Sequence, residues 1–493
     1  MASTAGLRGV DGYVRKLVQK HRIPGLALLI TKNGRNRFAK GYGFRDVAAQ
    51  LPVTPRTIFG VASVTKSFTA LAVLRLQETG RLKVTDPVVR YLPEFRTPSV
   101  RWTKRIRLSH LLTHTSGLPP LPSIYFTSGR SLVRDPPYDN RTARRVGIDP
   151  EHPPIDTYSQ LLEYLATAQY RMLGPPGTKF SYSNEAFGLL AAVIEGVDGR
   201  KYEQFLEEEL LRPAGMSATT FDTGIMLRSP EVTTLYSPPR TGGGRGLHAS
   251  EDWWEDTCLR AAGGLRSNLE DLARYLEIYR TGGRIGSERI LSRASVAEMT
   301  RPRIEIVPGE WYGYGLFVVP GFPGGPLIHH SGGLKGVSSY FAVLPGRGLT
   351  GVALANREGV PSHLAVQAGF NRLTGRPMKA QPAPPPIRPE APGPLTEYAG
   401  WYCSGEGIWF RVRPVRRRLR LDFTGIEMTL KNFQLRSNGA DEFVRGPRGG
   451  PTAFLRFERD TQGRIWAAFV GWRLVRRRSV RDLPKARTGR MVW

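Results

Sequence analysis

Cysteine is scarce in this chain of 493 residues, which has two, Cys258 and Cys403. They lie far apart, so the sequence predicts no cysteine cluster for a metal ion. A single disulfide would add little to the stability of a chain of this size. We expect no metal and no cofactor.

Long apolar stretches are missing as well. No run approaches the roughly 20 residues that a membrane-spanning helix needs, so no membrane span is expected. The first residues, Met-Ala-Ser-Thr-Ala-Gly-Leu-Arg, lack the apolar segment of a signal peptide. This predicts a cytoplasmic protein, with the mature form of an exported protein as the alternative.

Acidic residues are few: 42 Asp and Glu stand against 71 Lys and Arg, and the formal net charge is +29. Such a charge can bind nucleic acid or an anionic surface. However, no nucleic-acid-binding module is visible, and the arginine runs at residues 416–418 and 476–478 fall on strand-like segments whose alternate residues face solvent. We interpret the charge as a solvated surface and expect no nucleic-acid partner.

Proline is concentrated at residues 379–395, where the sequence Lys-Ala-Gln-Pro-Ala-Pro-Pro-Pro-Ile-Arg-Pro-Glu-Ala-Pro-Gly-Pro-Leu predicts an extended, semi-rigid linker. With 40% hydrophobic residues, the chain can form the large cores of two or three domains. We predict one domain at residues 1–378 and another at residues 396–493. The sequence does not fix an oligomeric state, and a homo-oligomer is kept as an option.

Helical and strand-like patterns occur without repeating βαβ units, which predicts an α+β fold with an antiparallel sheet. After residue 400, short alternating strands at even spacing predict a small antiparallel sheet or barrel. The elements expected before the linker are helices at residues 7–21, 63–79, 159–172, 187–194 and 362–373 and strands at residues 25–31, 37–42, 312–319, 327–330, 337–344 and 349–355.

Ser63 and Lys66 stand at the start of the apolar helix, three residues apart and on the same face. Free N–H groups and the helix dipole there favour an oxygen that becomes anionic. A desolvated lysine amine can act as its base. The Ser-x-x-Lys spacing is common by chance, but it occurs once in this chain, and the helix is nearly free of charge until Arg75. We interpret the pair as a nucleophile and its base.

Tyr182 and Asn184 project from a turn at the start of another apolar helix, a place where catalytic side chains tend to lie. The alternative is that the Tyr182 ring packs while Asn184 caps the helix. A second Tyr-x-Asn, Tyr138 and Asn140, lies in an irregular segment. Of the two tyrosines, we predict Tyr182 to be the catalytic one.

His330, Ser331, Gly332 and Gly333 lie between two predicted strands. His329 and His330 alternate across the strand, so one of them faces a cleft. The two glycines allow something to approach the backbone closely.

Two other histidines, His110 and His114, have the four-residue spacing of metal ligands. Since no third ligand accompanies them, we interpret them as tying down a turn. Ser267 is expected to cap a helix in a capping box with Glu270. The irregular residues 119–157 and 238–258 are expected to shape the substrate pocket.

The chain resembles the serine β-lactamase and penicillin-binding-protein-like family, specifically its class C-like branch of esterases, D-aminopeptidases and carboxypeptidases. The resemblance covers about residues 8–375 and implies an antiparallel sheet flanked by helices, beside a helical subdomain, with the site between them. Residues after the linker resemble the lipocalin-like C-terminal domain of some members. The motifs that carry the resemblance are, in chain order, Ser63-x-x-Lys66, Tyr182-x-Asn184 and His330-x-Gly332, with the flanking residues 110–118, 176–184 and 262–265.

The resemblance implies a role for each motif residue. Ser63 is the nucleophile, and Lys66 and Tyr182 share proton transfer, with the choice of base left open. The remaining implied roles are an oxyanion hole formed by the N–H groups of Ser63 and Gly333 and substrate contacts from Asn184, His330, Ser331 and Gly332.

One departure from the family affects the expected substrate. His330 stands where many β-lactamases have a permanently charged lysine, and histidine is neutral or partly charged near neutral pH. We therefore expect a serine hydrolase for esters or small peptide amides, of esterase or D-aminopeptidase type. The alternatives are a β-lactamase or D-Ala-D-Ala carboxypeptidase and a non-catalytic binding protein on the same scaffold.

Overall fold

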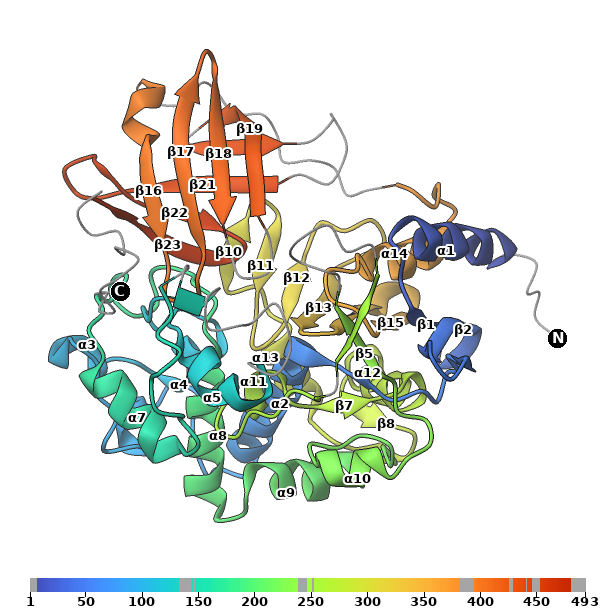
Figure 1. Cartoon of the computed structure of the whole chain (residues 1–493). Helices are drawn as coiled ribbons and strands as arrows, with labels where there is room; N and C mark the ends of the chain where they lie inside the picture. Colours follow the sequence, from blue (N-terminus) through green and yellow to red (C-terminus); the bar gives the residue numbers. More distant parts are fainter. Residues whose placement is uncertain are drawn as a thin grey trace.

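A nine-stranded antiparallel sheet forms the centre of the first part of the chain (Figure 1). The computed structural model describes residues 7–132, 143–144, 147–237, 246–250, 252–380, 394–424, 429–439, 441–445 and 453–479. In spatial order, the strands are β10 (Ile304–Val307), β11 (Glu310–Tyr312), β12 (Phe317–Val319), β13 (Leu327–Leu334), β14 (Val337–Leu344), β15 (Leu349–Ala355), β1 (Gly25–Lys32), β2 (Arg35–Asp46) and β3 (Leu51–Pro52).

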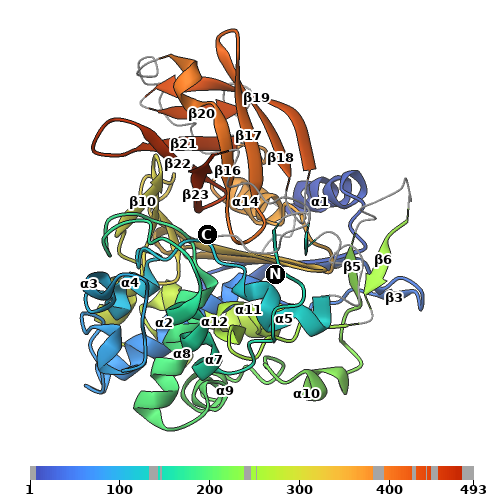
Figure 2. The same cartoon turned by 60° about the vertical axis from the view of Figure 1, so that its left-hand side comes forward.

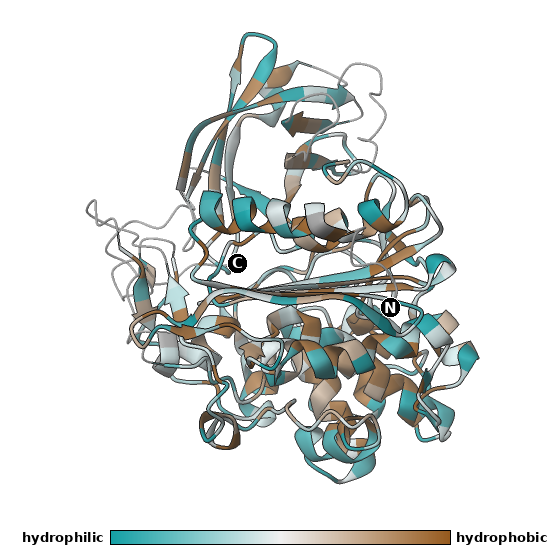
Figure 3. Ribbon diagram, turned by 90° about the vertical axis from the view of Figure 1, so that its right-hand side faces the viewer, coloured by the Kyte–Doolittle hydropathy of each residue, from teal (hydrophilic) through white to brown (hydrophobic). Residues whose placement is uncertain are grey.

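β1 lies in the interior of the sheet and is buried on both faces, which explains why it reads as a continuous apolar run. Its side chains alternate: Leu28 and Ile30 join one hydrophobic core, and Leu29 joins the other. Two helices, α1 (Arg8–Lys20) and α14 (His363–Leu373), cover the first face. Figure 3 shows the sheet edge-on between these helices and the larger helical layer.

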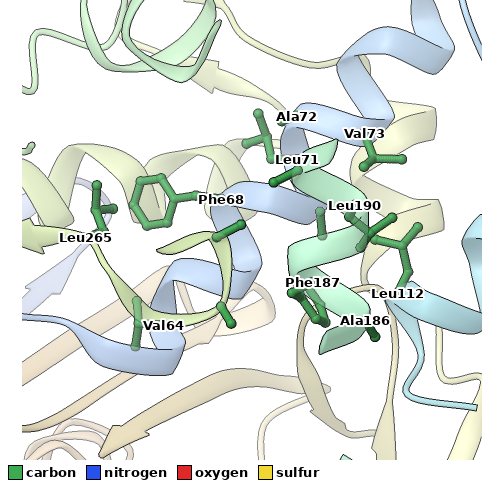
Figure 4. Packing of buried hydrophobic residues seen from close by; sticks show 14 of the residues in the cluster. Val64, Phe68, Leu71, Ala72, Val73, Leu112, Ala186, Phe187, Leu190 and Leu265 are labelled. Atoms are coloured by element: carbon green, nitrogen blue, oxygen red, sulfur yellow. The ribbon is translucent and has the colours of Figure 1, made fainter. Parts of the chain in front are cut away.

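The larger layer contains α2, which packs beside α8 in one buried cluster that includes Phe68, Leu71, Phe187 and Leu190 (Figure 4). This packing buries α2 on nearly all sides, and the turn at its N-terminus contacts β13 and β14 in the interior of the sheet. The helices here are α2 (Thr65–Glu78), α3 (Val100–Thr103), α4 (Leu108–Leu112), α5 (Ser123–Leu132), α7 (Tyr158–Thr167), α8 (Asn184–Asp198), α9 (Tyr202–Leu206), α10 (Thr223–Leu227), α11 (Arg260–Gly263), α12 (Leu269–Thr281) and α13 (Arg293–Met299).

Three short two-stranded sheets complete this part of the chain: β4 (Phe59–Gly60) with β7 (Arg266–Ser267), β5 (Leu235–Ser237) with β6 (His248–Ser250), and β8 (Arg284–Ile285) with β9 (Glu288–Arg289). The first pair matters most for the site, because β4 leads directly into the Ser63 turn. Within the described ranges, none of the helices combines the length and the apolar character needed to span a bilayer.

A closed eight-stranded antiparallel barrel follows, above the β10–β12 edge of the sheet (Figures 1 and 2). Its interior is filled by side chains that include five aromatic rings: Tyr398, Tyr402, Phe410, Phe443 and Phe457. The strands are β16 (Gly400–Cys403), β17 (Trp409–Val415), β18 (Arg418–Thr424), β19 (Thr429–Gly439), β20 (Glu442–Arg445), β21 (Ala453–Arg459), β22 (Ile465–Val470) and β23 (Arg473–Arg478).

The predicted fold class is confirmed: an antiparallel sheet flanked by helices, a helical region and a small barrel. Two helix starts differ from the prediction. Ser63 lies in a 3₁₀ turn, Ala62–Val64, and α2 begins at Thr65. The predicted capping box of Ser267 and Glu270 is wrong, because Ser267 belongs to β7 and the side chain of Asn268 accepts from Asp271 N–H instead.

Other element boundaries predicted from local sequence also differ from those in the structure. The helix expected at residues 159–172 ends at Thr167, and the irregular segment 119–157 contains α5. Arg416 is in the left-handed turn between β17 and β18, at φ 53°, instead of on a strand. Most of the predicted linker, residues 381–393, lies outside the described residues, and the domain boundaries stay a prediction.

Candidate active site

A cavity of about 400 Å³ lies where the Ser63 turn, β13, the start of α8 and the barrel meet. Of the predicted site residues, it brings together Ser63, Tyr182, Asn184, His330, Ser331 and Gly333. Much of its wall is apolar and comes from Ile124, Tyr125, Trp254, Leu259, Leu334, Ile408, Phe423 and Trp472. Such a wall suits an apolar acyl or leaving group.

A strained turn presents Ser63 to this cavity. Ala62, the preceding residue, has φ 47°, a left-handed conformation that costs a residue with a side chain on the order of 1–3 kcal/mol. The Thr65 hydroxyl donates to Ala62 O at 2.7 Å and fixes the turn. Gly332 packs behind it, where an added Cβ would lie 2.3 Å from Val61 O. Gly332 thus allows strand and turn to meet, and its predicted substrate contact stays untested.

Lys66 is fully buried, and its amine contacts three oxygens. Nζ lies 3.2 Å from Ser63 Oγ, 2.9 Å from Asn184 Oδ1 and 2.6 Å from Ala262 O. Burial, with a further contribution from the Arg473 charge, lowers the pKa of Lys66 well below its usual value. A neutral amine donates two hydrogens, which the Asn184 and Ala262 oxygens can accept. Its lone pair then faces the Ser63 hydroxyl.

Tyr182 also reaches Ser63, since its hydroxyl forms a hydrogen bond with the serine side chain. Burial raises the pKa of Tyr182 despite this bond, so the phenol keeps its proton near neutral pH. The ring stacks on His114, with centroids 4.1 Å apart. Ser183 N–H donates to His114 Nδ1 at 3.1 Å, which places the proton of a neutral ring on Nε2. His114 therefore supports the tyrosine, while His110 accepts from Arg107 N–H within its own turn.

Asn184 opens α8, but it does not cap that helix. Ser183 is the N-cap residue and accepts from Ala186 N–H. The Asn184 side chain is left to bind Lys66, and it lines the cavity. Of the two interpretations of Asn184 that the sequence allowed, the helix cap is therefore wrong, and the side chain lines the cavity.

His330 faces the cavity from β13, and His329 lies on the opposite face beside Glu310. The Nδ1–H of His330 donates to Ser331 O at 2.6 Å, and Nε2 accepts from the Tyr312 hydroxyl at 3.1 Å. Burial is the largest cause that lowers the pKa of His330, to about 3. His330 is therefore neutral at physiological pH, and this position supplies no cation.

The sequence analysis assigned no role to the barrel residues that enter the cavity. Arg473 and Glu406 form an ion pair at 2.7 Å, with 15% and 8% of their side chains exposed. They come from β23 and from the loop between β16 and β17. One sequence signal was available: Gly471-Trp472 is a two-residue hairpin turn with an aromatic residue at its tip, and both residues are left-handed.

A buried carboxyl group, Glu185, lies next to this site. Ser183 Oγ donates to Glu185 Oε2 at 2.7 Å, and Ser123 Oγ donates to Oε1. Burial raises the pKa of Glu185 from 4.5 to about 7. The folded protein thus holds a proton between those pH values that the unfolded chain has lost. The contribution of Glu185 to stability therefore falls as pH rises from 4.5 to 7.

We expect Glu185→Gln to remove this dependence. Relative to the variant, the wild type should lose roughly 3 kcal/mol of unfolding free energy between pH 4.5 and pH 7.5. Urea unfolding of both proteins at several pH values measures the difference. Glu270→Gln, at an exposed position of α12, is the control: it keeps Glu185 and should show the same pH dependence as the wild type. A constant difference between wild type and Glu185→Gln would show that Glu185 is ionised in both states.

Several predicted features lie outside the described residues: Tyr138, Asn140 and the segment 238–245 of the second irregular loop. The structure therefore does not compare the two Tyr-x-Asn sequences. Among the residues it does describe, no three His, Cys, Asp or Glu side chains are grouped as metal ligands would be.

The chain is similar to known proteins over most of its length. The family model described as Beta-lactamase matches residues 10–376. "Protein flp" of Staphylococcus aureus (strain MW2) is 32% identical over 212 residues, 43% of this chain and 38% of that protein. The chain thus spans well under half the length of this relative. "Penicillin-binding protein 4*" of Bacillus subtilis (strain 168) is 25% identical over 426 residues, 83% of this chain and 86% of that protein.

The solved structure of the octameric penicillin-binding protein homologue from Pyrococcus abyssi is similar over almost the whole length. It covers 95% of this chain and 99% of its own, with 26% identity and a TM-score of 0.65. The similarity therefore extends beyond residue 376, into the barrel.

Proposed function

This chain belongs to the Beta-lactamase family and is a serine hydrolase, and we propose that Ser63 forms an acyl-enzyme with esters or small peptide amides. The observation that carries this proposal is the pair of proton-transfer groups on one hydroxyl. Lys66 Nζ and the Tyr182 hydroxyl both contact Ser63 Oγ, and burial shifts their pKa values in opposite directions.

The opposite directions of the two shifts support a division of roles. Lys66, whose pKa is lowered, accepts the proton as Ser63 Oγ attacks the carbonyl carbon. The N–H groups of Ser63 and Gly333 stabilise the oxyanion. Tyr182, neutral because its pKa is raised, donates a proton to the leaving alcohol or amine as the bond breaks. Lys66 then passes its proton to Tyr182, which restores both groups. Water attacks the acyl-enzyme while Lys66 accepts its proton, and Ser63 Oγ takes that proton as the acid product leaves.

The charges around the cavity favour a substrate without a carboxylate. His330 is neutral, and the positive charge that Arg473 brings to the cavity wall is already paired with Glu406. Asp256 adds a buried carboxyl group whose pKa is raised by burial to about 6. These acids would repel the carboxylate of a penicillin. They would not repel a neutral ester, and they would attract the free amino group of a peptide. This supports esterase or D-aminopeptidase activity over β-lactamase activity.

The test is turnover and covalent labelling of the wild type. It uses a fluorophosphonate, a p-nitrophenyl ester, a D-amino acid p-nitroanilide and benzylpenicillin, each followed by intact mass and peptide mapping. We expect a fluorophosphonate adduct on Ser63, turnover of the ester or the anilide, and slow or absent turnover of penicillin. Rapid penicillin turnover would overturn the proposed substrate class. No adduct with any reagent would favour a binding protein on this scaffold.

We also propose that the chain assembles with copies of itself. The Pyrococcus abyssi homologue, octameric by its description, is similar over 95% of this chain. Two large apolar side chains of α10, Ile225 and Leu227, are more than half exposed. Light scattering on the purified protein decides the point, and a monomer at all concentrations would contradict it.

A further inference from the structure

The barrel docks onto the segment that carries Tyr182. Tyr182 N–H donates to Trp472 O at 2.9 Å, and Leu474 N–H donates to Ser181 Oγ at 3.3 Å. Phe469 and Leu474 of the barrel share a hydrophobic cluster with Tyr182. In both views, β22 and β23 lie beside β10 (Figures 1 and 2). The barrel is therefore fixed at the backbone of the residue that contacts Ser63.

This docking carries a charge pair into the cleft. The Arg473 guanidinium lies 4.6 Å from the centre of the Tyr182 ring, and Lys66 Nζ lies 4.8 Å from the same centre. Glu406 holds the guanidinium through Nε. Burial alone would lower the pKa of Arg473, but Glu406, with smaller contributions from Tyr182 and Glu185, outweighs burial and the pKa is raised. The guanidinium stays charged, and it contacts the same tyrosine ring as the lysine amine.

We propose that Arg473 and Glu406 are positioning residues, supplied by the barrel, whose opposite charges together set how tightly Lys66 holds its proton: Arg473 favours the neutral, proton-accepting amine, and Glu406 opposes it and holds Arg473 in place. The inference rests on the proposed function, because it assumes that Lys66 is the base. It makes the barrel part of the hydrolase site, although both barrel residues act through Lys66.

The balance of charges around Lys66 explains why a pair is needed. Carboxyl groups face it from three elements: Glu185 of α8, Asp256 before α11 and Glu406 of the barrel, and each raises the pKa of Lys66. After burial, Arg473 is the largest influence that lowers it. The nearby histidines, His114 and His330, have lowered pKa values and stay neutral. Arg473 therefore offsets the acids, and Glu406 holds Arg473 in place.

The two members of the pair must have opposite effects on the reaction. With Arg473→Gln, Glu406 is left unbalanced and Lys66 holds its proton more tightly. The acid limb of the pH–rate profile should move up by about one pH unit. With Glu406→Gln, Arg473 is left unbalanced, and the limb should move down by a similar amount. The double variant should return close to the wild-type midpoint.

The experiment is the pH dependence of fluorophosphonate labelling of Ser63, followed by mass spectrometry. This reaction needs the activated serine but no substrate recognition. Arg473→Lys keeps the charge and should keep the midpoint, which guards against a folding defect in Arg473→Gln. The control is Arg476→Gln, also on β23, whose guanidinium donates to Met172 O at 2.6 Å and does not line the cavity.

The outcomes separate the two proposals. Opposite shifts that cancel in the double variant support the inference. Shifts in the same direction, or unchanged midpoints in folded variants, overturn it and leave the proposed function intact. If the wild type is not labelled at any pH, the proposed function itself fails.

Discussion

Replacing Ser63 with alanine is expected to abolish covalent labelling and to lower kcat/KM on the order of 10⁶-fold, the scale of loss when a serine hydrolase loses its nucleophile. The reason lies in the contacts of Lys66, whose amine meets Ser63 Oγ and two amide oxygens, from Asn184 and Ala262. The serine hydroxyl is the one of the three that can attack a carbonyl. Intact-protein mass spectrometry and turnover of a p-nitrophenyl ester measure the loss.

Ser67, one turn further along α2, is the matched control. Its hydroxyl donates to Val64 O and accepts from the Tyr275 hydroxyl, both at 2.8 Å, within the core. Ser67→Ala should cost about 1 kcal/mol of stability and leave labelling unchanged. If Ser63→Ala were still labelled at the wild-type rate, the nucleophile would lie elsewhere and the proposed mechanism would be wrong.

Much of the candidate site was predictable because its residues stand at the ends of regular elements. Ser63 and Lys66 are close in sequence, so their contact follows from the local turn. Tyr182 could be chosen because it precedes an apolar helix. That these residues meet in one site could not be read from local sequence. It was predicted from the resemblance to a family in which the same motifs follow in the same order. The structure places Ser63 and Tyr182 around one cavity, with Lys66 bonded to Ser63.

The strained turn before Ser63 could not be read from the sequence. The same apolar pattern can follow a serine that caps a helix and a serine in a 3₁₀ turn, so the sequence does not distinguish the two. The difference is set by Gly332, 269 positions later, which lets the strand approach Val61. The capping box at Ser267 failed for a similar reason, because pairing of β7 with β4 takes Ser267 into a strand and leaves the cap to Asn268.

The residues that the barrel contributes to the site could not be predicted from the sequence either. Arg473 stands on an arginine-rich strand whose pattern indicates a solvated face. Docking of the Trp472 turn onto Tyr182 buries this one arginine in the cleft. A residue's burial against another domain depends on a shape that local sequence does not encode. Arg473 and Glu406 therefore required the structure.

Replacing Tyr182 with phenylalanine is expected to cut turnover of amides and alkyl esters by roughly 10²–10⁴-fold. The variant keeps the ring that stacks on His114, so the fold should be preserved and the loss should come from the hydroxyl. A p-nitrophenyl ester should be much less affected, because its leaving group departs without a proton. Turnover of matched anilide and ester substrates measures the ratio.

That ratio decides which group acts as the base. If Tyr182 removed the Ser63 proton, both substrate types would slow equally, because the attack precedes any difference in the leaving group. An unequal loss assigns the tyrosine to the leaving group and the lysine to the serine. Tyr125→Phe is the matched control, since Tyr125 lines the same cavity but its hydroxyl donates to Glu406 O. Tyr138→Phe tests the other Tyr-x-Asn sequence, and a severe loss there would show that the wrong tyrosine had been chosen.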